Sequence, residues 1–467
     1  MIIRQVNHTE EDTLIIKVFR EGQEPSNQSM FRAEKGEIWW YSSQELWLGL
    51  GKDLKLPNLL KVFRSLFFKR KDRWPAHIIL DARIFSIEEI ELAVNGILLA
   101  GYNLQLYKSE PKLPSPFFGV KGQLDIWSEQ DSEETGRAID LAQKTAAVQV
   151  RIMDLMNAPA NYKTPQTLGQ WAVDSGEANH YGVTILDKKD LQQMGMHALL
   201  AVSKGSDVPP VMIVTDYKPP HYEKTVAFVG KGVTFDTGGI SIKPSANMHL
   251  MKSDMGGAGA VLGIVELVAQ LQIPVRVIGI IPSTENSVDG SAMKPGDVIG
   301  SYAGKTIEVI DTDAEGRLIL ADGLAYAVKH FSPDILIDLA TLTGSVIQTL
   351  GYEAAGLFTP NDDLARELTL AGEKTGERLW RLPVWDEYKE EISSDIADLK
   401  NYHGKPLAGA IVAAKFLEVF TASHGAWAHL DIAGTVFGDN EFAPGRAGTA
   451  YGVRLLRAFL YTLTARN

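Results

Sequence analysis

Residues 225–244 read TVAFVGKGVTFDTGGISIKP, and this stretch decides the fold that we expect. Its first part, from Val226 to Gly230, is a short apolar run, which is typical of a strand buried on both faces. Its second part, from Lys231 to Pro244, is a loop dense in charge and glycine. In open α/β sheets, ligands bind beyond the carboxyl ends of the strands. The stretch therefore predicts a buried strand that leads directly into a ligand-binding loop.

The same alternation continues on both sides of this stretch. Stretches with apolar residues at helical spacing occur at Ala258–Gln270 and Leu318–Phe331. Strands alternating with helices predict an α/β fold with a central, mostly parallel or mixed sheet flanked by helices. The further buried strands that we predict are Gly182–Leu186, Val211–Thr215, Val275–Ile281, Thr306–Ile310 and Ile335–Leu339.

A break in composition separates this region from the N-terminal part. Prolines cluster at positions 111, 114 and 116, and a polar, acidic segment follows at residues 128–135. We therefore expect two domains: a smaller N-terminal α/β domain at residues 1–125 and a larger domain, carrying the chemistry, at residues 126–467. The elements predicted around the break are strands at Ile15–Phe19 and His77–Leu80 and helices at Ser86–Leu104 and Arg137–Met156.

The composition of the 467-residue chain excludes several classes of protein. With 46 basic and 58 acidic residues, the formal net charge is −12, which disfavours a general polyanion binder but allows a local basic patch. There is no cysteine, so disulfides, thiolate metal sites and cysteine nucleophiles are excluded. The N-terminus does not look like a signal peptide, and no uninterrupted apolar run approaches the about 18 residues of a membrane helix. We expect a cytoplasmic protein with no membrane and no nucleic-acid partner.

Four carboxylates lie in or beside loops that follow predicted strands. Asp236 and Asp254 come after the strand that ends at Gly230, while Asp313 and Glu315 come after the strand predicted to end at Ile310. If these groups converge, repulsion and desolvation raise their pKa values unless cations compensate. Two divalent cations would balance four carboxylates, and oxygen ligands suit magnesium, manganese or zinc. The other interpretation is a set of ordinary solvated turns.

Nucleotide-binding signatures are incomplete in this chain. The stretch GSYAGKT at residues 300–306 has one residue too few between its glycines for a phosphate-binding loop. The pair Gly230 and Gly232 lacks the third glycine of a dinucleotide fingerprint, because Phe235 stands there. A nucleotide-dependent α/β enzyme therefore stays as an alternative hypothesis only.

Taken together, the loop sequences resemble one known family. Residues 311–318, DTDAEGRL, are similar to the NTDAEGRL signature of the leucyl aminopeptidases, peptidase family M17. The resemblance implies a metal-dependent exopeptidase that releases N-terminal residues, preferably leucine or another bulky apolar residue, by a two-metal mechanism with a bridging hydroxide. The segments that carry the similarity are residues 157–161, 229–244, 251–257, 311–318, 340–344 and 427–434.

Carried over position by position, the resemblance implies a role for each residue of these loops. Lys243 and Arg317 would be the catalytic basic residues, with a bicarbonate ion held at Arg317 to shuttle a proton. The cofactors would be two divalent ions per subunit, Mn²⁺ or Zn²⁺. A nearby dication disfavours the ammonium form of lysine, which permits a lysine amine to act as a metal ligand. The implied metal ligands are Lys231, Asp236, Asp254, Asp313 and Glu315.

The resemblance also implies a substrate pocket and an assembly. Peptides would be the substrates and a homohexamer the assembly, and a regulatory DNA-binding member of the same family is the second alternative. Only the basic run at residues 69–73 favours that alternative. Asp311 departs from the family pattern, which has asparagine there. The pocket residues implied are Met251, Thr341, Leu342 and Gly344.

Overall fold

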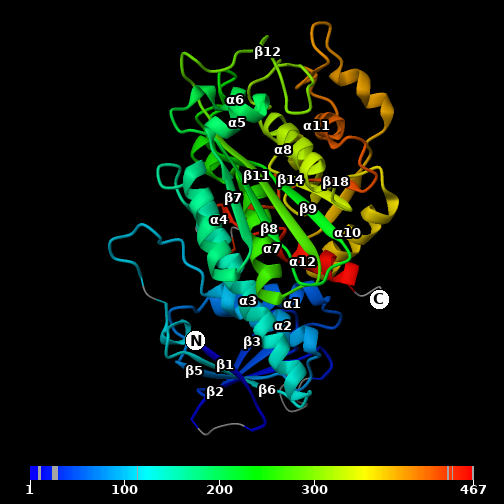
Figure 1. Ribbon diagram of the computed structural model, residues 1–467. Coiled ribbons are helices and arrows are strands. Elements are labelled where there is room, and N and C mark those ends of the chain that lie inside the picture. Colours follow the sequence, from blue (N-terminus) through cyan, green and yellow to red (C-terminus); the bar gives the residue numbers. More distant parts are fainter. Residues whose placement is uncertain (9–11, 24–29, 113, 439–440, 444, 465–467) are drawn as a thin grey trace. The chain divides into compact units, whose positions relative to one another are not determined.

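The computed structural model describes residues 1–467 except 9–11, 24–29, 113, 439–440, 444 and 465–467. The chain forms two compact units, coloured along the sequence in Figure 1. The N-terminal unit contains residues 1–150 and a short segment that begins at Glu441, and the C-terminal unit contains the rest.

The N-terminal unit is built on a sheet in which the described strands have the order β1-β6-β5-β2-β4-β3. All neighbours in this sheet pair in parallel except β3 and β4. The predictions for β2, β5 and α2 are confirmed, and α2 begins where Ser86 and Glu89 form a capping box. The elements are β1 (Ile2–Val6), β2 (Leu14–Phe19), β3 (Ile38–Ser42), β4 (Glu45–Gly49), α1 (Leu56–Phe68), β5 (His77–Asp81), α2 (Ile87–Ala100), η1 (Pro116–Phe118), β6 (Gln123–Trp127) and α3 (Ser132–Asn157).

The boundary predicted at residue 125 falls inside β6, which pairs with β1 on one side and β5 on the other. The two compact units instead divide after Val150, within the long helix α3. The prolines at positions 111–116 thus come before strand β6, and the polar segment at residues 128–135 connects β6 to α3 and includes the first turn of that helix. Composition alone cannot distinguish such a connection from a linker between domains.

The C-terminal unit is built on a larger sheet, whose order over the described residues is β16-β15-β18-β14-β9-β11-β8-β7, with β10 beside β11. Its centre, from β18 to β11, is parallel, while β8 and β15 pair antiparallel with their inner neighbours. The main strands are β7 (Gly182–Leu186), β8 (Val211–Tyr217), β9 (Thr225–Gly230), β10 (Gly232–Asp236), β11 (Arg276–Asn286), β14 (Ile335–Ala340), β15 (Ala355–Phe358), β16 (Leu379–Leu382) and β18 (Trp427–Asp431).

Helices cover both faces of this sheet (Figure 1). On one face α7 packs against α4 and α12, and on the other α8 packs against α6 and α11. The mixed α/β fold with flanking helices is therefore confirmed. The helices are α4 (Pro165–Asn179), α5 (Lys188–Met194), α6 (His197–Val202), α7 (Gly256–Leu271), α8 (Gly316–Phe331), α9 (Gly344–Leu350), α10 (Asp362–Thr375), α11 (Gly409–Glu418) and α12 (Val453–Thr464), with short turns η2 (Ser203–Gly205), η3 (Met248–Ser253), η4 (Asp386–Ile392) and η5 (Val419–Thr421).

One predicted strand of the main sheet is wrong. Only Ile307–Glu308 of the expected Thr306–Ile310 run forms a strand, β13, in a small separate sheet between β12 (Val298–Ile299) and β17 (Leu399–Lys400). Its residues alternate between buried and partly exposed, as in a strand covered on one face only. Beyond it, the backbone N–H of Ile310 donates to the side chain of Asn401 at 2.8 Å instead of to a strand. A short paired sheet at β19 (Phe437–Gly438) and β20 (Ala447–Gly448) completes the described strands.

The start of α7 approaches the sheet closely because two glycines face each other there. A Cβ added at Gly257 would lie 2.0 Å from the carbonyl oxygen of Leu339, and one added at Gly230 would lie 2.6 Å from the carbonyl oxygen of Gly257. The continuous stretch from Met248 to Leu271 is long and apolar enough for a membrane span, but 89% of its most apolar window is buried inside the protein. It is accordingly a core helix of this unit.

Candidate metal and catalytic centre

The topology of the larger sheet leaves a crevice at the carboxyl end of β9. Strand β9 lies between β11 and β14, and α7 leads from β9 towards β11 on one face while α8 leads towards β14 on the other. The strand order therefore reverses at β9, which is where open α/β sheets bind ligands. Lys231 follows β9 directly, Asp254 comes two residues before α7, and Glu315 directly precedes α8, so all three reach this end of β9.

Lys231 lies between two of the predicted carboxylates. Its Nζ is 2.7 Å from Oδ2 of Asp254 and 2.9 Å from Oε1 of Glu315, and it donates a hydrogen bond of 2.9 Å to the carbonyl of Thr341. Gly316 makes room for this side chain, since a Cβ at Gly316 would lie 2.7 Å from Cε of Lys231. The amine therefore sits where three separate loops meet.

Lys243 holds the other two carboxylates. Its Nζ is 2.8 Å from Oδ2 of Asp236 and also forms an ion pair with Asp313. The second oxygen of Asp236 accepts hydrogen bonds from the backbone N–H of Gly238 at 2.8 Å and from Nδ2 of Asn286 at 2.9 Å. Asp236 is therefore oriented through both of its oxygens.

The donor atoms fit a divalent cation. Asp236, Asp313 and Glu315 each offer a carboxylate oxygen, and these three oxygens lie within 4.8 Å of one another. Over the described residues, Oε2 of Glu315 is buried and accepts no hydrogen bond. A buried carboxylate oxygen without a donor is costly unless a cation binds it. The structure thus brings all five predicted metal ligands together with Lys243.

The electrostatics of the cluster agree with this interpretation. Burial raises the pKa values of Asp254, Asp313 and Glu315 above their ordinary range, and repulsion from the carboxylate of Asp236 raises them further. Burial alone would lower the pKa values of Lys231 and Lys243, but the surrounding carboxylates reverse the sign and raise them. Four carboxylates against two lysines leave an excess of negative charge, which divalent cations can neutralise.

Arg317 is a buried guanidinium whose hydrogen-bonding capacity is barely used. Nη1 donates to the carbonyl of Asn401 at 2.7 Å, while the buried Nε has no hydrogen-bond partner among the described residues. Burial lowers the pKa of Arg317 to about 10, so the group stays positively charged at neutral pH. The remaining donors are suited to an oxyanion, because guanidinium presents a planar fork of N–H groups.

A cavity of about 340 Å³ opens beside Lys243, Asp313 and Arg317. Of the four predicted substrate residues, Leu342 and Gly344 line it, and Met251 and Thr341 do not. The hydroxyl of Thr341 instead donates to Oδ1 of Asp254 at 2.7 Å. Met251 belongs to η3, where its carbonyl accepts from the N–H of Asp254 at 3.3 Å. The lining residues that were not predicted as site residues are Asp311, Ala314, Thr343, Ser345, Gln348, Tyr402, Lys405, Pro406 and Gly409.

Sequence reasoning missed residues that hold these loops in place. Asn401 accepts from the N–H of Ile310 at 2.8 Å and donates to the carbonyl of Asp311 at 2.6 Å. Asp431 accepts from the N–H of Leu342 at 3.1 Å and from the hydroxyl of Thr343 at 2.6 Å. Asp431 lies within residues 427–434, a segment that resembles the family, and this resemblance was the one feature of the sequence that could have identified it. Asn401 stands about 90 residues from its partners in sequence, and no local pattern marks it.

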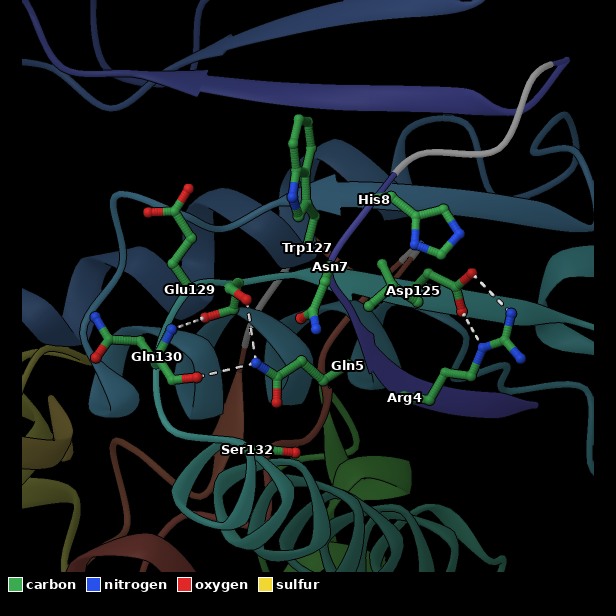
Figure 2. Close-up of a pocket in the computed structure, with 11 residues that line it drawn as sticks. Arg4, Gln5, Asn7, His8, Asp125, Trp127, Glu129, Gln130 and Ser132 are labelled. Carbon is green, nitrogen blue, oxygen red and sulfur yellow. Dashed lines mark hydrogen bonds and ion pairs between the residues drawn. The ribbon is translucent and has the colours of Figure 1, made fainter.

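The N-terminal unit has a cavity of its own, of about 830 Å³, at the carboxyl ends of β1 and β6 (Figure 2). Its buried carboxylate, Asp125, is neutralised by Arg4 at 2.9 Å and by a hydrogen bond with His77 at 2.8 Å. Although burial opposes this, these contacts hold the pKa of Asp125 below its ordinary value. Figure 2 also shows Gln5 bonded to the carbonyls of Ser128 and Gln130. No predicted site residue lines this cavity.

Comparisons with known proteins agree with the fold and the site. Residues 151–457 match the model of the cytosol aminopeptidase family, catalytic domain (Peptidase M17). A probable cytosol aminopeptidase of Chlorobium phaeobacteroides is 45% identical over 91% of this chain and 89% of its own length. One of Chlorobium limicola is 52% identical over 67% of this chain and 62% of its own length. The solved structure of the bottromycin maturation enzyme BotP in complex with Mn is similar with a TM-score of 0.87 and 30% identity, covering 97% of this chain and 99% of that chain.

The fold and the carboxylate cage define a metal-dependent hydrolase. More specifically, the chain belongs to the cytosol aminopeptidase family, peptidase family M17, as its resemblance had implied. Its reaction class is therefore metal-dependent hydrolysis that releases residues from the N-termini of peptides.

Proposed function

We propose that this aminopeptidase uses two divalent ions, Mn²⁺ or Zn²⁺, held by Lys231, Asp236, Asp254, Asp313 and Glu315. The observation that carries the proposal is the convergence of these side chains, including the buried and unpaired Oε2 of Glu315. Bound divalent ions would polarise the scissile carbonyl and lower the pKa of a water molecule towards neutral pH.

Three residues of the chain would bind the substrate amine, stabilise the oxyanion and assist proton transfer. Asp254 would bind the free α-amine of the peptide, which accounts for removal of the N-terminal residue only. Lys243, between Asp236 and Asp313, would donate to the oxyanion that develops on the carbonyl oxygen. Arg317 stays charged and is therefore a poor base, so we propose that it holds a bicarbonate ion which moves the proton.

We propose a preference for leucine or another bulky apolar residue at the peptide's N-terminus. Leu342 and Gly344 line the cavity beside the centre, whereas Thr341 and Met251 form hydrogen bonds with Asp254. Gly344 has no side chain and no neighbour within 4 Å of an added Cβ, which leaves space for a substrate side chain.

We further propose a cytoplasmic homohexamer that acts on peptides. Large apolar side chains of the C-terminal unit are exposed, including Trp380 at 64%, Trp385 at 63% and Leu407 at 69%. Apolar surface of this kind commonly marks subunit contacts. The relatives' names, probable cytosol aminopeptidase, support the compartment. The DNA-binding and nucleotide-dependent alternatives gain no support from the comparisons.

Chelation followed by metal replacement tests the proposal. Hydrolysis of leucine-p-nitroanilide should disappear after dialysis against a chelator and return on addition of Mn²⁺ or Zn²⁺. Glu315→Gln should lose activity and metal together, because it removes a buried carboxylate ligand. Asp395→Asn, at an exposed carboxylate, is the matched control and should change neither. Full activity in the chelated protein, or metal content unchanged by Glu315→Gln, would contradict the proposal.

A further inference from the structure

The C-terminal unit contains a second cavity that shares no residue with the metal and catalytic centre. It has a volume of about 470 Å³, and its lining residues come from α5, α6, η2 and β12 with Gly300 after it, so we name it the α5–α6 groove. Figure 1 labels α5, α6 and β12. This volume is within the range of small-molecule sites. Its lining residues are Lys188, Gln192, His197, Leu200, Ala201, Ser203, Lys204, Val298, Ile299 and Gly300.

The groove is basic in a strongly acidic protein. Lys188 and Lys204 contribute two positive charges, and no acidic residue lines the groove. In the part of the chain that the structure describes, neither ammonium group forms an ion pair or a hydrogen bond. In a chain with a net charge of −12, a concave surface lined by two lysines and by no acidic residue differs in charge from the protein as a whole.

Two carboxylates at the start of α5 accept hydrogen bonds from the backbone. Asp187, next to Lys188, accepts from the N–H groups of Lys189 at 2.8 Å and Asp190 at 3.0 Å. Asp190 in turn accepts from the N–H of Asp187 at 3.1 Å. These hydrogen bonds orient both carboxylates towards the backbone at the start of α5, and among the described residues neither carboxylate forms an ion pair with Lys188 or Lys204.

Apolar side chains form part of the same lining. Leu200, Ala201 and Ile299 contribute to it, and Val298 is 47% exposed at its edge. His197 packs over Gly300, since a Cβ there would lie 3.1 Å from the histidine Cδ2. A ligand in this groove would meet an apolar surface together with positive charge.

Both walls of the groove are anchored to one buried carboxylate, Asp322 of α8. It accepts from the N–H groups of Ala198 at 3.0 Å and Leu199 at 2.9 Å on one wall. On the other wall it accepts from the N–H of Tyr302 at 2.8 Å, two residues after Gly300. The groove is therefore held in shape before a ligand arrives, which lowers the entropic cost of binding.

We propose that the α5–α6 groove binds a small organic anion, a phosphate monoester or a carboxylate carried on an apolar group. The two lysines would bind the anionic head, and the surface of Leu200, Val298 and Ile299 would cover the apolar part. This inference does not rest on the metals or on the substrate preference proposed above.

Calorimetric titration of the metal-loaded protein tests this site. The probes are phenyl phosphate and benzoate, which distinguish the two head groups, together with inorganic phosphate and neutral benzyl alcohol. At least one of the two aromatic anions should bind more tightly than either part alone. In Lys188→Met/Lys204→Met that binding should weaken about tenfold or more, because two charged contacts are lost. Val298→Asp should weaken it as well, by placing a negative charge at the rim.

The controls separate this groove from the catalytic centre. Lys218→Met removes an exposed lysine elsewhere and should leave binding unchanged, and Arg317→Met should retain binding at the groove. Thermal unfolding verifies that each variant is folded. Three results would overturn the proposal: no aromatic anion binds at millimolar concentration, benzyl alcohol binds as tightly as the anions, or the double lysine variant binds like the unmodified protein.

Discussion

At the residue scale, the two buried lysines of the centre are each paired with carboxylates. Lys231 is paired with Asp254 and Glu315, and Lys243 with Asp236. Removing one member of a buried pair leaves an uncompensated charge and commonly costs about 3–5 kcal/mol. Substitutions of these residues therefore act on stability as well as on activity, and metal content has to be measured beside the rate.

Arg317→Met should lower kcat by about 10²–10⁴-fold, the usual effect of losing general acid–base assistance, because the bicarbonate ion proposed to move the proton would no longer be held, and it should not cause loss of metal. The guanidinium contacts the carbonyl of Asn401 and none of the predicted metal ligands within the described chain, so the cage should persist. Steady-state hydrolysis and metal analysis of the same sample check this, with exposed Arg366→Met as the control. Full activity in Arg317→Met would refute the role given to this residue.

Lys163 is a buried residue that makes stability depend on pH. Its side chain is 1% exposed and donates to the carbonyls of Met156 and Lys252. Burial, helped by repulsion from Lys252, lowers the pKa of Lys163 to about 7, whereas an unfolded lysine has a pKa of about 10.4. Between these values the unfolded chain binds the extra proton, so this residue makes stability rise with pH by up to about 1.4 kcal/mol per pH unit.

Lys163→Met should therefore reduce the increase in unfolding free energy between pH 7 and pH 10. Urea denaturation at several pH values measures this slope for the variant and the unmodified protein. Lys218→Met, at an exposed lysine, should leave the slope unchanged. Equal slopes for Lys163→Met and the unmodified protein would contradict the assignment.

At the scale of elements, the site depends on how closely α7 and α8 start beside β9. Asp254 and Glu315 are attached to the beginnings of these two helices, on opposite faces of the sheet. Gly257 and Gly316 permit the approach, because a side chain at either position would collide with neighbouring atoms. Helix placement, rather than local loop conformation, therefore brings the two carboxylates to one lysine.

Gly257→Ala should destabilise the C-terminal unit by about 1–3 kcal/mol or more, the usual cost of overpacking. The added methyl group would lie 2.0 Å from the carbonyl oxygen of Leu339, so either α7 or β14 has to move. Metal affinity should fall together with stability, since Asp254 precedes α7. The matched control is Gly425→Ala, where no atom lies within 4 Å of the new Cβ. An unchanged urea midpoint for Gly257→Ala would contradict this account.

At the scale of the whole molecule, exposed apolar side chains of the C-terminal unit are the feature that an isolated chain does not explain. Trp380 and Trp385 are both more than 60% exposed, and Trp385 stacks on Tyr388 with ring centroids 6.3 Å apart. Their position near β16 leaves them available to another subunit. Burying such aromatic surface contributes strongly to association.

If the protein forms the hexamer proposed above, the double substitution Trp380→Glu/Trp385→Glu should shift it towards smaller species. Sedimentation velocity measures the distribution, and Val120→Glu, at a residue 91% exposed in the N-terminal unit, is the control. A monomer in the unmodified protein, or an unchanged hexamer in the double variant, would contradict the proposed assembly or this contact surface respectively.

The sequence by itself determined the α/β fold of the C-terminal unit, because buried strands and amphipathic helices carry local periodicities. It also determined which residues are candidate ligands, since the loops from Lys231 to Lys243 and from Asp311 to Arg317 match a known signature. The strand predicted at Thr306–Ile310 failed because an apolar run does not reveal which sheet a strand joins.

Only the tertiary structure shows which hydrogen bonds fix the conformation of the site loops. Asn286, Asn401 and Asp431 act through hydrogen bonds to residues about 50 to 90 positions away, and such contacts leave no local pattern. The α5–α6 groove is a similar case, because Lys188 and Lys204 meet β12 only after the chain folds. Local periodicity records which face of an element is buried, whereas the partners of a polar side chain depend on how distant elements pack.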